Sequence, residues 1–200
     1  MTSAVRTTLW AIVALVAAAL GWLSYELSVS QTRIAEAPYG APFALLDQRG
    51  DKITEAAFQG RPTALFFGFT HCPEICPTTL FELDGWLKQV DPNGGRIGAY
   101  FVTVDPERDT PALLGSYVAG VSDRIVGITG APDAVANALK DFNIYAKRVP
   151  IDPAKPDGDY TMDHTASIIL LDGGGRFKGT IAYGENPETA VEKLANLLKG

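Results

Sequence analysis

The stretch that decides the fold is TALFFGFTHCPEICP at residues 63–77, which joins an apolar run to two cysteines and the start of a helix. Its first seven residues form a continuous apolar run, which is typical of a strand buried on both faces of a sheet. Apolar side chains then recur at helical spacing over residues 77–90, and Pro77 suits the first helical position because it lacks an N–H. We therefore expect Cys72 and Cys76 between a central strand and a helix, at the edge where α/β sheets usually bind ligands.

Apolar runs and helical patterns alternate along the rest of the chain. Further strands are expected at 43–46, 52–54, 97–104, 125–128, 167–171 and 177–181, and further helices at 111–118, 132–142 and 187–199. Residues 150–161 carry Asp, Pro, Lys and Gly and are expected to form a loop. This order predicts an α/β fold of the thioredoxin-like type, with a mixed sheet flanked by helices on both faces.

The N-terminal segment predicts a membrane helix. No residue from 7 to 25 is charged, and about 20 apolar residues are needed to cross the hydrocarbon core of a bilayer. Arg6 precedes the run and Glu26 follows it, a weak positive-inside signal that places the rest of the chain outside the cytoplasm. We expect residues 1–25 to be an uncleaved transmembrane anchor, with a cleaved signal peptide as the alternative.

The expected organisation is an anchor, then a tether at residues 26–40 that lacks any hydrophobic period, then one domain at residues 41–200. The N-terminal flank is too short for a mitochondrial transit peptide, which favours a single pass through a bacterial inner membrane. The domain would then lie in the periplasm, an oxidising space where a free cysteine pair needs a function. The net charge of −6 argues against a nucleic-acid partner.

The cysteine pair suits either a disulfide or a metal. The whole chain has only two cysteines and two histidines, which excludes a cysteine-only zinc site and leaves an iron–sulfur cluster short of ligands. Four helical positions span about 6 Å, so Cys72 and Cys76 can bond to each other or share one ion. Their spacing is one residue wider than the C-x-x-C redox motif, which makes chelation more plausible. The positive end of the helix is expected to favour thiolate.

A third donor is expected from His164, just before the predicted strand at 167–171. In a thioredoxin-like sheet the loop that enters this strand faces the cysteine turn. Two sulfurs and one imidazole nitrogen suit copper as Cu(I) or Cu(II), and we expect Asp163 to orient the imidazole. His71 and Met162 are the other soft donors nearby, but His71 diverges from its neighbour Cys72, and Met162 fits packing or an exposed loop.

Three motifs together resemble the Sco/SenC family, the copper chaperones for cytochrome c oxidase assembly. They are GFTHCPEICPTTL at 68–80, VDPERDTP at 104–111 and DHTA at 163–166. The resemblance implies a thioredoxin-like fold with copper held by Cys72, Cys76 and His164. It also implies delivery of copper, or reduction of thiols, at the binuclear copper site of oxidase subunit II, with a periplasmic copper donor or thiol reductant as a further partner. The charged residues at 105–109 fit either a capped, ion-paired loop or an electrostatic role near copper.

Two functional classes stay open at this point. The first is a metallochaperone without turnover, and the second is a thiol–disulfide oxidoreductase that reduces client cysteines with Cys72 and Cys76 as its redox-active pair; the two are compatible, since Cu(I) binding needs the reduced pair. A static disulfide is less favoured, because closing so short a loop stabilises little. A peroxiredoxin-like peroxidase is disfavoured, because Pro73 occupies the position where that motif has threonine. His164 separates the two main classes, since disulfide exchange needs only sulfurs.

Overall fold

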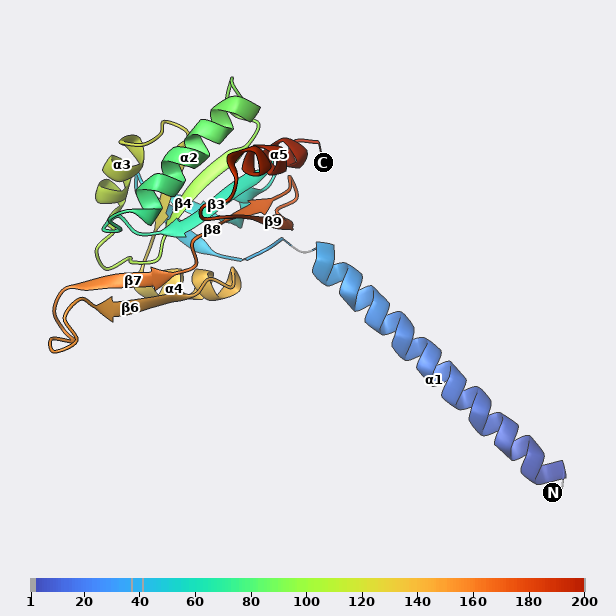
Figure 1. Ribbon diagram of the computed structural model, residues 1–200. Helices are drawn as coiled ribbons and strands as arrows, with labels where there is room; N and C mark the ends of the chain where they lie inside the picture. The colour runs from blue at the N-terminus through green and yellow to red at the C-terminus, as the bar shows by residue number, and fades with distance from the viewer. Residues whose placement is uncertain (1–2, 37, 41, 200) are drawn as a thin grey trace. The chain divides into compact units, whose positions relative to one another are not determined.

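The computed structural model describes residues 3–36, 38–40 and 42–199 and divides the chain into two units, Met1–Ala37 and Pro38–Gly200 (Figure 1). In the first unit, α1 spans Ser3–Glu36. Its segment Val5–Ser28 is long and apolar enough to cross a membrane, and none of it is buried against protein.

The helix continues through most of the segment that was expected to be a tether without helical period. Residues 26–36 contain neither proline nor glycine, and Pro38 is the first residue after them that disfavours a helix. The segment expected to be a tether is thus helical over residues 26–36, because a helix that has already started propagates through polar residues at little cost.

In the described part of the second unit, the centre is a seven-stranded mixed sheet in the order β2-β1-β5-β4-β3-β8-β9. Strands β3, β4 and β5 are parallel to one another, and the remaining neighbours pair antiparallel. The strands are β1 (Ala44–Asp47), β2 (Lys52–Thr54), β3 (Thr63–Gly68), β4 (Gly98–Thr103), β5 (Ile125–Thr129), β8 (Ser167–Leu171) and β9 (Phe177–Ala182).

Helices cover both faces of this sheet. Figure 1 shows α2, α3 and α5 on one face and α4 on the other, and α2 packs beside α5. The helices are α2 (Ile75–Val90), α3 (Pro111–Ala119), α4 (Pro132–Asp141) and α5 (Pro187–Leu197), with a short 3-10 turn η1 (Glu55–Phe58) after β2. The predicted α/β fold, thioredoxin-like with a mixed sheet flanked by helices, is confirmed.

The hydrophobic core is built around β3 and β4, as the apolar run predicted. Every residue of both strands is buried, and the Phe66 and Phe101 rings stack with centroids 6.0 Å apart. The parallel register brings Gly68 opposite Thr103 at the carboxyl ends of the two strands. Burial on both faces fixes the end of β3, from which the cysteine turn leaves the sheet.

A two-stranded antiparallel arm stands apart from the main sheet (Figure 1). It consists of β6 (Ala146–Pro150) and β7 (Tyr160–His164), with Ala146 opposite His164 and Pro150 opposite Tyr160. The expectation of a loop over residues 150–161 was therefore wrong at both ends. Neither strand has the apolar alternation that predicts a half-buried strand, because the two pair with each other at the surface of the domain.

Candidate metal centre

The turn between β3 and α2 places both cysteines. Helix α2 begins at Ile75, two residues before the predicted start. Pro77 is then the third residue of α2. Proline is tolerated there, because the first amides of a helix have no partner within the helix. The backbone N–H of Cys76 donates instead to Sγ of Cys72, 3.4 Å away, so this sulfur satisfies an amide at the positive end of α2.

Cys76 is fully buried at the start of α2, against the end of the central strand. A Cβ atom added at Gly68 would lie 2.7 Å from Sγ of Cys76 and 2.7 Å from a ring carbon of Phe101. No side chain fits in that space without moving the sulfur or the ring. Glycine at the last position of β3 therefore allows the sulfur to approach the sheet.

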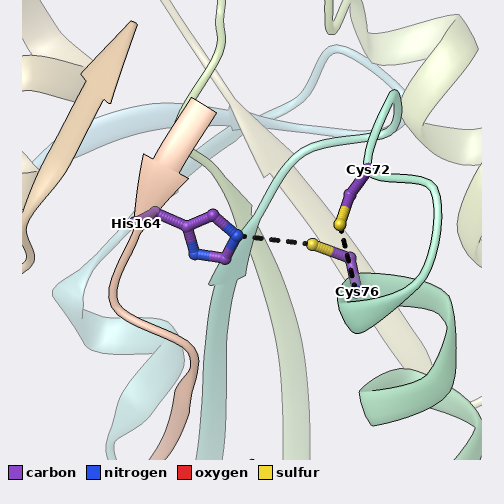
Figure 2. Close-up of side chains that lie close together, drawn as sticks. All are labelled: Cys72, Cys76 and His164. Carbon is purple, nitrogen blue, oxygen red and sulfur yellow. Dashed lines mark hydrogen bonds between the residues drawn. The ribbon is translucent and has the colours of Figure 1, made fainter. Parts of the chain in front are cut away.

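His164 is the last residue of β7 and points its ring toward the cysteines (Figure 2). The ring packs edge-on against Phe69, with centroids 5.7 Å apart and planes at 90°. Its Nδ1 lies 3.0 Å from the carbonyl oxygen of Thr165. Because a carbonyl can only accept, Nδ1 carries the proton, and in the neutral ring the lone pair of Nε2 is free to bind a metal.

These residues form one compact donor group. Nε2 of His164 lies 3.6 Å from Sγ of Cys76, and the ligand atoms of Cys72, Cys76 and His164 all lie within 4.8 Å of one another (Figure 2). The structure thus brings together the three residues singled out from the sequence, although 88 positions separate the histidine from Cys76. Two sulfurs and one nitrogen form a soft donor set that fits copper.

The other candidate donors lie elsewhere. His71 is outside the donor group found among the described residues, and its Nδ1 lies 3.1 Å from Oγ1 of Thr70. Asp163 is exposed, and strand alternation directs it away from the face that carries His164. The prediction that Asp163 orients the imidazole was therefore wrong, because the carbonyl of Thr165 occupies that role.

A cavity of about 240 Å³ opens beside the donor group. The cysteine turn, including Cys72 and Pro73, lines one part of it, and β7, including Met162 and His164, lines another. Met162 therefore faces the same space as two of the three donors. A ligand or partner that enters this cavity reaches Cys72 and His164, while Cys76 stays buried beneath them.

The charged loop after β4 is hydrogen-bonded to the cysteine turn. The fully buried carboxylate of Asp109 accepts hydrogen bonds from the hydroxyls of Thr70 and Thr103, each at 2.6 Å, and from the backbone N–H of Thr70 at 3.2 Å. Oγ1 of Thr110 caps α3 by accepting from the N–H of Leu113. Asp105 and Arg108 form an ion pair, as the ion-paired-loop alternative expected, whereas Asp109 is the buried anchor of the cysteine turn.

Sequence reasoning missed Thr70 and Tyr160. Thr70 lies within the cysteine motif at 68–80, but nothing in its type or spacing indicates a bond to a carboxylate 39 positions away. Tyr160 precedes His164 by four residues on the same strand, so the two side chains share a face of β7. Period-2 spacing could have shown this only if β7 itself had been predicted.

The two thiols differ strongly in acidity. The pKa of Cys72 falls to about 4, first because the S–H of Cys76 donates to it, and further through hydrogen bonds from the backbone N–H groups of Cys76 and Glu74. The same shared proton, together with burial, raises the pKa of Cys76. In the metal-free protein the pair is therefore a thiolate at Cys72 and a thiol at Cys76.

Comparison with known proteins places this site in a family. The model of the SCO1/SenC family matches residues 31–199, which is most of the chain. The chain belongs to the SCO1/SenC family.

Relatives of this family share the sequence and the fold. The chain is 35% identical over 161 residues to the mitochondrial protein SCO1 of Saccharomyces cerevisiae, covering 80% of this chain and 54% of that relative. The chain thus spans about half the length of that relative. A structure of Bradyrhizobium japonicum ScoI with copper bound is 42% identical, with a TM-score of 0.70, and covers 82% of this chain and 98% of its own. Yeast Sco1 with copper bound is 34% identical, with a TM-score of 0.73, covering 82% and 90%.

The unequal acidity of the two thiols predicts selective alkylation. In the reduced, metal-free protein, iodoacetamide at pH 6 should label Cys72 and leave Cys76 unmodified, because only Cys72 is a thiolate there. The alkylation rate of Cys72 should rise through a midpoint of about pH 4. Mass spectrometry of the labelled peptides measures both. In Cys76→Ala, which lacks the S–H donor, the midpoint should move upward, and a wild-type midpoint near that of a free thiol, about 8.5, would contradict this account.

The buried Asp109 predicts a defined loss of stability. In the wild type each carboxylate oxygen of Asp109 accepts from one threonine hydroxyl. In Asp109→Asn one of these oxygens becomes an NH₂ group, which donates and cannot accept. The substitution should lower the free energy of unfolding by about 1–3 kcal/mol, measured by urea titration. The matched control is Asp163→Asn on the exposed side of β7, which should stay within about 0.5 kcal/mol of wild type. Equal stability of the two variants would show that Asp109 does not anchor the turn.

Proposed function

We propose that this chain is a copper metallochaperone that binds the ion through Cys72, Cys76 and His164. The observation that carries the proposal is the convergence of their three ligand atoms within 4.8 Å, beside an open cavity. Thiolates and imidazole prefer copper over hard ions such as Mg²⁺ or Ca²⁺. The copper-bound structures of Bradyrhizobium japonicum ScoI and yeast Sco1 support the choice of copper.

The geometry suits an ion that is bound and then handed on. Structural zinc sites are closed by four protein ligands, whereas the donor group here, taken over the described residues, has three. Cys72 and His164 face the cavity, so donor groups of a client can replace them while Cys76 still holds copper from the buried side. The N–H group of Cys76 and the end of α2 then stabilise the released thiolate of Cys72.

The client we propose is subunit II of cytochrome c oxidase, at its binuclear copper site. Membership of the SCO1/SenC family supports this choice, as does the resemblance of the three sequence motifs to copper chaperones of oxidase assembly. The apolar segment Val5–Ser28 supports a single-pass anchor in a bacterial inner membrane. In this arrangement residues 1–25 are the anchor, residues 26–40 the tether, and residues 41–200 the copper-binding domain in the periplasm, where a copper donor or thiol reductant supplies it.

A second function, thiol–disulfide exchange, is favoured by the acidity of Cys72. Its thiolate attacks one sulfur of a client disulfide, forms a mixed disulfide and releases the other client sulfur as a thiolate. The sulfur of Cys76, once deprotonated, then attacks Cys72 and releases the second client thiolate. The client gains two electrons and this chain becomes the Cys72–Cys76 disulfide. The two functions coexist, because Cu(I) binding requires the reduced pair.

Replacing His164 distinguishes copper binding from exchange. Loss of a residue that only supports a metal ligand usually lowers metal affinity by about 10- to 100-fold. In His164→Ala the ligand itself is lost, so copper affinity should fall by more than this. The cysteine pair should remain reducible in the same variant. Competition with a chromogenic Cu(I) chelator, using the full chain in detergent, measures the affinity. His71→Ala is the matched control and should match wild type, whereas unchanged affinity in His164→Ala would remove this residue from the site.

The two thiolates are tested separately. Cys72→Ser and Cys76→Ser should each abolish stoichiometric Cu(I) binding, because a hydroxyl is a hard, protonated donor that does not replace a thiolate. Metal analysis after gel filtration measures the copper retained per chain. A variant that keeps one copper per chain would refute the site built on both sulfurs.

A further inference from the structure

His164 belongs to an element that the main sheet does not hold. In the described part of the chain, β6 and β7 pair with each other and with no strand of the seven-stranded sheet. Cys72 and Cys76, by contrast, sit on the turn between β3 and α2, which the core fixes. His164 is joined to β8 of the main sheet through Thr165 and Ala166 alone, and its position relative to the sulfurs also depends on how the other end of β7 is fastened to the domain.

The aromatic ring of Tyr160 lies between two guanidinium groups. The central carbons of Arg108 and Arg148 are each 3.7 Å from its centroid. Two groups at this distance cannot share one face of a ring, so one lies on each side. Arg148 comes from β6 and Arg108 from the loop after β4, so the ring joins the arm to the domain body.

Hydrogen bonds and ion pairs fasten the same junction. The hydroxyl of Tyr160 donates to Oδ1 of Asp105 at 2.8 Å, and Nη1 of Arg108 donates to the carbonyl oxygen of Tyr160 at 2.9 Å. Nε of Arg108 is paired with the buried Asp105, and Arg148 lies 3.7 Å from Glu107. We call Tyr160, Arg108, Arg148 and Asp105 the Tyr160 clamp.

The clamp acts on the metal site along β7 and through Phe69. Tyr160 and His164 lie on one face of a short strand, about 13 Å apart at 3.3 Å per residue. Fixing Tyr160 therefore restrains the position of His164 relative to the cysteine sulfurs. Arg108 also lies 5.8 Å from the centroid of Phe69, and Phe69 packs edge-on against the His164 ring. The clamp thus contacts both the strand that carries the imidazole and an aromatic ring that supports it.

We propose that Tyr160 is a positioning residue of the metal site, and that its stacking between Arg108 and Arg148 holds Nε2 of His164 toward the two sulfurs. This inference rests on the proposed copper function. It assigns the charged loop after β4 a second role beside the anchoring of the cysteine turn. A clamp that supports only the fold would affect stability without changing the contribution of His164 to copper binding.

A double-mutant cycle with His164 tests the proposal. In the full chain in detergent, Tyr160→Ala should weaken Cu(I) binding by about 10- to 100-fold, the range for residues that orient a metal ligand. In the His164→Ala background the same change should have little effect, because no imidazole remains to be positioned. Tyr160→Phe keeps the ring between the guanidinium groups and should recover most of the affinity. Wild-type affinity in Tyr160→Ala, or an equal loss in both backgrounds, would overturn the inference.

Two further variants keep the test decisive. If Tyr160→Ala does not fold, Arg148→Gln removes one side of the stack and should give a smaller loss that again vanishes in the His164→Ala background. Equal losses there would contradict the proposal in the same way. Ile151→Thr, at an exposed position in the turn of the arm, is the matched control and should bind copper as wild type does.

A metal-free readout separates this inference from the copper function. Amide hydrogen exchange in β7 should be faster in Tyr160→Ala than in wild type, while exchange in β3 stays unchanged. If wild type binds no copper but exchange in β7 responds, the proposed function fails, and Tyr160 holds the strand that carries His164 without serving a copper site. If wild type binds copper and exchange in β7 does not respond, the clamp fails and the proposed function stands.

Discussion

Two independently supported elements must bring three soft ligand atoms to one point, and the rest of the account depends on that convergence. The buried strand β3 and helix α2 fix the sulfurs, because the core around Phe66 and Phe101 leaves the cysteine turn little freedom. The arm fixes the imidazole from outside the sheet. The stable core thus sets one half of the site, and a few polar and aromatic contacts at the surface set the other.

The metal-free site is already arranged for a soft cation. The carbonyl of Thr165 holds the proton on Nδ1 of His164, so the other ring nitrogen is available. The N–H of Cys76 and the S–H of Cys76 stabilise the thiolate of Cys72. Binding copper as a complex of two thiolates therefore requires the loss of one further proton, from Cys76, whose raised pKa keeps it protonated until a cation replaces that proton.

The sequence predicted the parts of this site whose signals are local. The apolar run at 63–69 identified the central strand, and the cysteine spacing with His164 identified the candidate donors that the structure brings together. It failed for the arm, because strands paired at the surface have no apolar alternation. It named Asp163 as the residue that orients His164, whereas the structure shows the backbone carbonyl of Thr165. Every residue has a backbone carbonyl, so the sequence does not indicate which one binds the imidazole. Tyr160 was missed because its partners lie 52 and 12 positions away, and only folding brings them together.

X-ray absorption at the copper edge tests the central claim most directly. The full chain, reduced and loaded with one equivalent of Cu(I), should show a first shell of two sulfurs and one nitrogen, with the outer-shell scattering that an imidazole ring produces. This result would place Cys72, Cys76 and His164 on a single ion. A shell of sulfur atoms alone, without imidazole scattering, would contradict the account, because the arm would then bring His164 close to the metal without binding it.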